Sequence, residues 1–540
     1  MPWVEAGREG AVPHSGERAT HWVGRAVFVA IAMLATACPQ APAGQPASEP
    51  LPKPLAEPVA PFDLTERAEL PLPAPRGPVR NELQTRWDHG LVLESAAGEF
   101  GLRIGGRVQA DASGFTAAAG PSLPPALGGL NPPLTGAANF RRARLRAGGR
   151  LAAATEWAAE FDFANQMTAY NAAFPTLTGP GSLPAMKDLW LQVHDLPWIG
   201  RLRVGNQKDA YGFEHVGDSR WLNFMERSFN QDAFEGPFND GYVPGIQLLN
   251  HTADGRVAWY LGEFKNTANP FGFANANGGS ETVGRLVVLP VFEDQGRRLL
   301  HLGISGRTMG LANLPTQIDP ATGRPTGPMI PAVRFRSRGS IRNGPPGPLN
   351  SIYADAGLLT GSWQNMLGIE LAANNGPLSL QGEYFGSWLS NAATTGVDPV
   401  NAGWQPPPGT PLGSVFFQGG YLEALWFLTG ESRGYDLAHS RFSRAVPRAN
   451  FYRRRGGDGR IHSSPGGWQV GLRYNYLCLS DGEVNGGVLN GMTLGLNWLL
   501  NPNARLVFNY DFTYRDFVNA AGQDGSGGIN AFGTRLAFDF

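Results

Sequence analysis

Arginine is the residue type in this sequence whose number and spacing point most directly to chemistry. Only four of the 44 basic residues are lysines, at positions 53, 187, 208 and 265. A guanidinium stays charged at any physiological pH and offers five donors that bind oxyanions in pairs. A row of moderately attractive sites would let an anion step from one to the next without trapping it. In strands whose side chains alternate between two faces, we choose eight arginines of the polar, inward face as the candidate anion contacts. They are Arg103, Arg107, Arg142, Arg144, Arg146, Arg203, Arg473 and Arg535.

Acidic residues share that inward face and would neutralise part of this charge. They are Glu160, Asp162, Asp188, Glu370, Glu383, Asp511 and Asp539. The formal net charge of the whole chain is −1, so it does not decide the balance. Two hypotheses stay open: a net cationic pathway for anions, or a mixed interior with weak selectivity.

A second group of charges lies in the segment 211–241, after the fifth alternating segment. Its candidate functional residues are Arg220, Glu226 and Arg227. Channel-forming barrels fold a loop inward from this position, and we therefore expect a constriction loop with internally paired charges. We expect no metal site, because the segment has no H-x₃-H pair and no cysteine. Motifs of the types G-x₄-G-K-[ST] and H-E-x-x-H are absent, and we predict no catalytic residues, no cofactor and no enzyme activity.

Strict alternation of apolar and polar residues defines the elements that carry these side chains. In 505–515 one face holds Leu506, Phe508, Tyr510, Phe512 and Tyr514. The other face holds Arg505, Asn509, Asp511, Thr513 and Arg515. Aromatic rings at nearly every apolar position, and a chain that ends on Phe540 of an alternating segment, are typical of outer-membrane barrels. The apolar faces are therefore assigned to lipid and the polar faces to a lumen.

Sixteen such segments can be counted, an even number as bacterial barrels require. They are 100–111, 140–150, 155–164, 187–194, 201–209, 243–250, 256–264, 282–290, 299–307, 363–373, 377–388, 415–429, 467–479, 490–500, 504–516 and 530–540. Long connections mostly alternate with short ones. The exception is 430–466, which is long although it falls on the short side. A misplaced strand there, or in 331–362 where Val333 to Arg338 also alternates, remains an alternative.

Composition and the N-terminal region agree with an exported all-β chain. Charged residues make up 16% of the 540 residues, against roughly 25% in a typical soluble domain. An apolar stretch from Ala26 to Leu34 follows Arg25, so 1–37 is predicted to be an export signal region. The Pro- and Ala-rich segment 38–80 is predicted to be a disordered spacer, and 81–540 the barrel. Cys38 directly follows the export signal region, and the sequence leaves open whether it is lipidated or removed with the signal.

Short motifs in 100–540 resemble the phosphate-selective porin O and P family. They are NFRRARL at 139–145, EFDF at 160–163, KDLW at 187–190, LRVGNQK at 202–208, FMERS at 224–228, VRFRSR at 333–338, LQGEYF at 380–385 and LTGE at 428–431. The resemblance implies a homotrimeric 16-stranded barrel in the bacterial outer membrane that takes up phosphate or related anions through an arginine track. The near absence of lysine and the acidic residues of the predicted constriction loop depart from that pattern. We therefore expect passive diffusion of small anions, with phosphate plausible but not exclusive.

The sequence is compatible with three functions of such a barrel. The chain is either the anion channel just described, a weakly selective general porin, or a structural or adhesive outer-membrane barrel whose long loops are functional. A secreted, carbohydrate-active all-β protein would need polar outer faces, which the aromatic face of 505–515 argues against.

Overall fold

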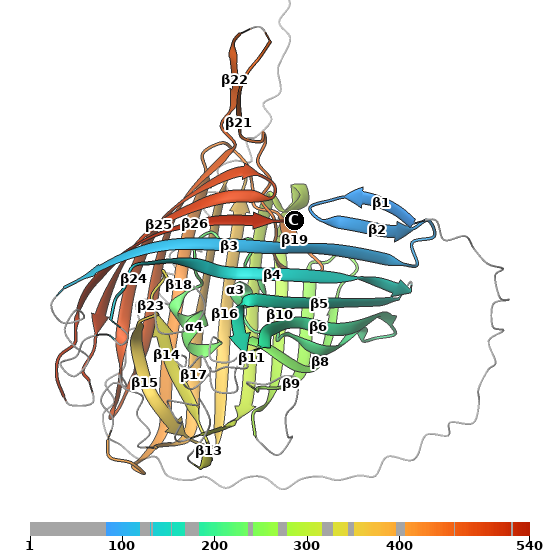
Figure 1. The fold of residues 1–540 in the computed structure, drawn as a ribbon. Coiled ribbons are helices and arrows are strands. Elements are labelled where there is room, and N and C mark those ends of the chain that lie inside the picture. Colours follow the sequence, from blue (N-terminus) through green and yellow to red (C-terminus); the bar gives the residue numbers. More distant parts are fainter. Residues whose placement is uncertain are drawn as a thin grey trace, which may run out of the picture.

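The computed structural model describes residues 83–118, 130, 133–152, 154–167, 183–235, 241–267, 278–315, 328–343, 350–395, 406–457, 459–519 and 522–540. The predicted export signal, the spacer and Cys38 lie outside these residues. A sheet of antiparallel strands closes into a ring where its last strand pairs with its first (Figure 1). The ring consists of β3 (Gly101–Ala117), β4 (Ala137–Ala152), β5 (Thr155–Met167), β6 (Leu183–Leu196), β7 (Gly200–Lys208), β8 (Tyr242–His251), β9 (Val257–Lys265), β10 (Ser280–Glu293), β11 (Arg298–Gly310), β16 (Trp363–Asn375), β17 (Leu378–Thr394), β18 (Pro411–Phe427), β23 (Gly467–Asp481), β24 (Val484–Asn501), β25 (Ala504–Asp516) and β26 (Gly527–Asp539).

These sixteen strands confirm the predicted barrel, and each overlaps one predicted segment. The remaining strands are β1 (Leu83–Trp87), β2 (Leu91–Ser95), β12 (Asn313–Pro315), β13 (Met329–Pro331), β14 (Val333–Arg338), β15 (Ile352–Thr360), β19 (Tyr435–Asp436), β20 (Arg441–Phe442), β21 (Tyr452–Arg455) and β22 (Ile461–Ser464). The helical elements are α3 (Phe213–Val216), α4 (Phe229–Phe234) and the 3₁₀ turn η4 (Asp294–Gly296). Among the described residues, no helix is long and apolar enough to cross a membrane.

The terminal residue completes the ring. The Phe540 backbone N–H donates to the Gly106 carbonyl over 3.1 Å, and the Gly106 N–H donates to the Phe540 carbonyl over 2.7 Å. A Cβ at Gly106 would lie 2.9 Å from the Phe540 ring, closer than real Cβ atoms come. Beyond this point the hairpin β1–β2 takes over the edge of β3, from Leu91 opposite Ile104 onward.

Side-chain exposure along the strands agrees with the predicted phase. On β25, Phe508, Phe512 and Tyr514 are exposed on the outer face, whereas Asn509, Asp511 and Arg515 are buried on the inner face. A strand with lipid on one side and a filled interior on the other must alternate in this way. The interior also holds an apolar cluster to which α4, β14 and β15 contribute, for example through Phe229, Phe335 and Tyr353.

The long connection 428–466 lies at the same end as the short turns, and the predicted strand count needs no change there. Its first part forms the small β19–β20 pair, whose Tyr435 hydroxyl lies 2.7 Å from Nδ1 of His301 on β11. Its second part, the β21–β22 hairpin, extends away from the barrel at the end where the C-terminus lies (Figure 1). The other ambiguous segment, around 331–362, forms β14 and β15, which are not barrel strands.

Candidate functional site

The segment between β7 and β8 folds into the barrel. Its described part, residues 209–235, carries α3 and α4, and every residue of α4 is buried. We call residues 209–235 the constriction loop. It packs against the inner wall of β23 to β26, where that wall carries glycines instead of side chains. Phe224 and Phe229 lie over Gly495 and Gly491, and Met225 lies over Gly533.

We predict that Gly495→Ala displaces the constriction loop. A Cβ at this position would lie 2.9 Å from the buried Phe224 ring, so the ring and the loop that carries it would have to shift. Overpacking of this kind costs about 1–3 kcal/mol of unfolding free energy. Denaturant unfolding should show the loss, and single-channel recording should show an altered conductance. Gly114→Ala on β3 is the matched control, since nothing lies within 4 Å of its added Cβ; an equal effect there would contradict the packing argument.

Glu226, at the centre of the constriction loop, is surrounded by arginines. Its carboxylate lies 2.8 Å from Arg141 Nε, 2.8 Å from Arg535, 3.5 Å from Arg342 and 3.7 Å from Arg142, and all five side chains are buried. Burial alone would raise the pKa of Glu226, but Arg141, Arg142 and Arg535 outweigh it and hold this pKa well below its ordinary value. Glu226 therefore stays charged and fixes the loop to β4 and β26.

Arg141 faces inward together with Arg142 because β4 bulges at this point. Arg142 is paired with Gln109, and Phe140 with the next residue of β3, Ala110, which leaves Arg141 as the extra residue. Strict alternation would have turned Arg141 toward lipid, and the sequence prediction did not include it. The pattern itself contains no signal for a bulge.

A second cluster joins the constriction loop to β3, β4 and β5. Arg107 pairs with Glu160 over 2.6 Å and also with Asp218 of the loop. Arg144 pairs with Asp162 over 2.7 Å and with Glu160 over 2.9 Å. Arg220 of the loop lies 2.9 Å from Asp218. The charges of these arginines are therefore largely balanced.

The remaining predicted residues occupy three kinds of position. Arg103 lies at the rim, half-exposed, and pairs with Asp88 over 2.8 Å. Arg473 and Arg227 are buried, and each donates to backbone carbonyls of the loop, Arg473 to Glu226 and Arg227 to Glu214 and Gly217. Arg535 binds Asp111 through two 2.7 Å hydrogen bonds in addition to Glu226.

Arg146 and Arg203 line a cavity beside the constriction loop. Arg146 pairs with Asp188 over 3.0 Å, and Arg203 stacks 4.1 Å from the Trp190 ring and donates to Gln192 over 2.8 Å. Lys208 and Arg441 line the same cavity, together with Arg107. Three aspartates, Asp188, Asp209 and Asp218, also line it, so the five basic residues are in excess.

A second cavity lies at the turn-side end of the barrel and is more strongly basic. Its charged lining residues are Arg107, Arg220, Arg433, Arg444, Arg505 and Asp539. Arg433 stacks 3.6 Å from the Phe442 ring, and Arg444 stacks 4.4 Å from Trp221 while pairing with Asp539. Among the described residues, no carboxylate lies within 4.0 Å of the Arg505 guanidinium. We call this the arginine vestibule.

Most of the arginine vestibule was not predicted from the sequence. Arg433 and Arg444 belong to the connection 428–466, whose fold no alternation reveals. Arg505 was placed on the inward face of its strand but was not chosen as a pathway residue. The sequence could have indicated this residue, because Arg505 falls on the inward face of its strand and Arg535 falls on the inward face of the next strand.

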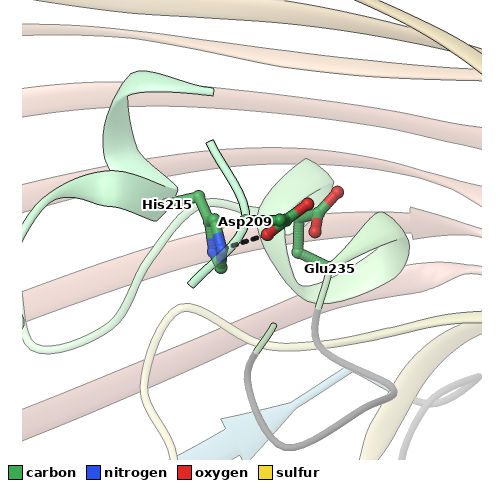
Figure 2. A group of neighbouring side chains, drawn as sticks. All are labelled: Asp209, His215 and Glu235. Carbon is green, nitrogen blue, oxygen red and sulfur yellow. Dashed lines mark ion pairs between the residues drawn. The ribbon is translucent and has the colours of Figure 1, made fainter. Parts of the chain in front are cut away.

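One group of side chains has the composition of a metal site. Asp209, His215 and Glu235 each offer a ligand atom, and these atoms lie within 4.8 Å of one another (Figure 2). All three come from the constriction loop, at its two ends. Spacing along the chain gave no reason to group them.

A closed 16-stranded barrel with apolar rings outside, charges inside and a loop folded into the lumen is the architecture of an outer-membrane porin. The model of the family "Phosphate-selective porin O and P" matches residues 103–540, and the chain therefore belongs to that family. This membership confirms the family suspected from the sequence. It places the protein in the bacterial outer membrane and makes it a channel protein.

Two curated relatives and two solved structures illustrate the similarity. An uncharacterized protein of Caulobacter vibrioides is 26% identical over 64% of this chain and 59% of its own length. Porin O of Pseudomonas aeruginosa is 23% identical over 84% of this chain and 91% of its own length. The anion-selective porin from Comamonas acidovorans has a TM-score of 0.40 at 11% identity, covering 82% of this chain and 100% of that one. The channel DcaP of Acinetobacter baumannii has a TM-score of 0.42 at 9% identity, covering 83% and 99%.

Proposed function

We propose that this porin allows passive diffusion of small anions, including phosphate, and that the arginine vestibule gives it its preference. The observation that carries this proposal is Arg505 in that cavity: no described carboxylate lies within 4.0 Å of its guanidinium, whereas the other four lining arginines each pair with a carboxylate. Guanidinium groups bind oxyanions bidentately and are less strongly hydrated than ammonium groups. A permeating anion therefore gains contacts there without binding tightly enough to be trapped.

The eight arginines predicted from the sequence contribute to this pathway unequally in our proposal. Arg107, Arg144, Arg146 and Arg535 are paired with carboxylates over 3.0 Å or less, so they shape the interior more than they attract anions. Arg203, which has no carboxylate within 4.0 Å among the described residues, is the predicted residue best placed to contact an anion.

A weakly selective general porin is the second candidate function, and the pairing of the interior arginines favours it. Strict phosphate selectivity would need unpaired cations along the whole path, whereas among the described arginines that line the two cavities only Arg505 and Arg203 have no carboxylate within 4.0 Å. The structural or adhesive barrel is the third candidate. An absence of single-channel conductance would favour that one.

We further propose that the functional unit is a homotrimer, as the family resemblance implies. Its partners are then small anions, outer-membrane lipid and two further copies of the chain. Native mass spectrometry in detergent should give three chains per particle. A monomer that keeps its conductance would remove the trimer from the proposal.

The reversal potential in a planar bilayer tests the proposed selectivity. With a potassium chloride gradient across the bilayer, we expect a potential whose sign corresponds to chloride passing more readily than potassium. Replacing chloride by phosphate or sulfate should keep that sign. A cation-selective current would overturn the proposal, and a potential near zero would favour the general porin.

A further inference from the structure

The constriction loop holds three buried donor side chains at its base. Asp209 follows β7, His215 lies on α3 and Glu235 follows α4, and none is more than 3% exposed. His215 Nε2 lies 2.7 Å from Asp209 Oδ1. In Figure 2 the Asp209 carboxylate lies between the His215 ring and the Glu235 carboxylate. The three residues thus join the beginning of the loop to its end.

Buried charges of both signs surround this site. Asp209, Glu235 and the nearby Glu281 are all buried carboxylates. Arg307 is their basic partner: its guanidinium lies 2.8 Å from Glu235 and 3.9 Å from Asp209. Asp209 and Glu235 share this one guanidinium, and Lys208 and Arg227 add positive charge on the His215 side of the site.

Two oxygen atoms in the site also lack a hydrogen-bond partner among the described residues. They are Oδ2 of Asp209 and Oε1 of Gln231, whereas Asp209 Oδ1 faces His215 Nε2 and Glu235 Oε1 faces Arg307. In native structures the large majority of buried polar side-chain atoms have a partner. The buried, unpartnered Oδ2 of Asp209, within a cluster of three residues that each offer a ligand atom, therefore indicates a ligand rather than ordinary packing.

Gln231 explains how His215 can serve as a ligand. Its amide nitrogen lies 3.0 Å from His215 Nδ1, but the nitrogen and oxygen of a glutamine amide are assigned from the hydrogen-bond network. If the amide is turned by 180°, its oxygen accepts from Nδ1–H, and the lone pair of Nε2 faces Asp209. This is the second-shell arrangement that usually orients a metal-bound histidine.

We propose that Asp209, His215 and Glu235 bind one divalent transition metal ion, with zinc as the best fit. One imidazole nitrogen with two carboxylates suits zinc, whereas calcium and magnesium prefer oxygen alone. Ligand distances of about 2.0–2.2 Å need only a small inward rotation of side chains whose donor atoms already lie within 4.8 Å of each other. The ion would tie both ends of the constriction loop together and fix the loop across the lumen. The expectation of no metal site rested on spacing within 211–241, which leaves out Asp209.

Calorimetric titration of the purified full-length porin tests this proposal. After EDTA treatment and dialysis, we expect zinc to bind with one site per chain, and the thermal unfolding temperature of the barrel to rise. His215→Gln and Asp209→Asn should each weaken zinc binding by at least about tenfold, the usual scale for loss of metal-site interactions. His301→Gln is the matched control. His301 is also fully buried beside a carboxylate, 3.2 Å from Glu370, but lies outside the cluster.

Absence of zinc binding by the wild-type porin would overturn the proposal, as would equal losses in the His301 control. X-ray absorption spectroscopy of the zinc-loaded wild type provides a test that does not depend on folded variants. We expect a first shell with one imidazole and otherwise oxygen. A shell with two or more imidazoles would assign the ion to another place and refute the site.

Discussion

Glu226→Gln should destabilise the barrel more strongly than Gly495→Ala does. The substitution keeps the shape of the side chain but removes the charge that Arg141, Arg142, Arg342 and Arg535 share. Breaking a buried ion pair by removing one partner costs about 3–5 kcal/mol, because it leaves the other charge uncompensated. Here four guanidinium groups are left close together, so we expect the upper part of that range.

Denaturant unfolding followed by tryptophan fluorescence should measure this loss as a lower midpoint. The pH dependence gives a further check. Because the pKa of Glu226 is depressed in the folded state, its contribution is present above the ordinary glutamate pKa of about 4.3 and is lost as the pH falls through the lower folded value. The difference between wild type and variant should therefore shrink in acid.

Glu94→Gln is the matched control for Glu226→Gln. Glu94 also pairs with an arginine, Arg86, over 3.3 Å, but both side chains are about half exposed. Water screens such a pair, and its loss should leave the unfolding midpoint unchanged. If both variants unfold alike, the arginine cluster around Glu226 does not hold the constriction loop in place.

The barrel was predictable because lipid imposes one simple rule on every strand. A residue such as Phe508 must face lipid and its neighbour Asn509 must not, so each strand carries its own phase in the sequence. Short turns between consecutive strands then make each strand pair with the next one along the chain. What alternation cannot show is where it fails locally, and the bulge that turns Arg141 inward is such a place.

The interior was less predictable because its contents come from connections rather than strands. The sequence predicted that the segment 211–241 would fold inward and offered Arg220, Glu226 and Arg227 as its candidate residues. It could not show that Glu226 would meet Arg342 from a different loop, or that Arg433 and Arg444 would reach the vestibule. Such contacts depend on how loops fold inside the barrel, and no periodic pattern records that.

The structure divides the arginines into those that stabilise the interior and those that are available to an anion. Removing a paired arginine such as Arg144 leaves Asp162 and Glu160 partly uncompensated, so its effect on selectivity would be mixed with an effect on folding. Arg505 is different, because no described carboxylate lies within 4.0 Å of its guanidinium. It is therefore the residue whose substitution reports most directly on ion selectivity.

Arg505→Glu should sharply reduce the preference for anions. At about 6 Å from a permeating ion and a dielectric constant of about 80, each unit of charge contributes about 0.7 kcal/mol. Reversing the charge raises the energy of an anion by about 1.4 kcal/mol and lowers that of a cation by the same amount, which is about tenfold for each ion and about a hundredfold in the chloride-to-potassium permeability ratio. Salt screens this interaction, so the reversal potential should be measured at low ionic strength and the effect should fade as salt rises.

Arg256→Glu is the matched control, because Arg256 is an exposed arginine on a turn at the same end of the barrel and does not line the vestibule. It changes the net charge of the chain equally. Its permeability ratio should stay close to that of the wild type if the vestibule, rather than overall charge, selects the ion. An unchanged ratio in Arg505→Glu, or an equal change in Arg256→Glu, would show that the vestibule does not set the selectivity.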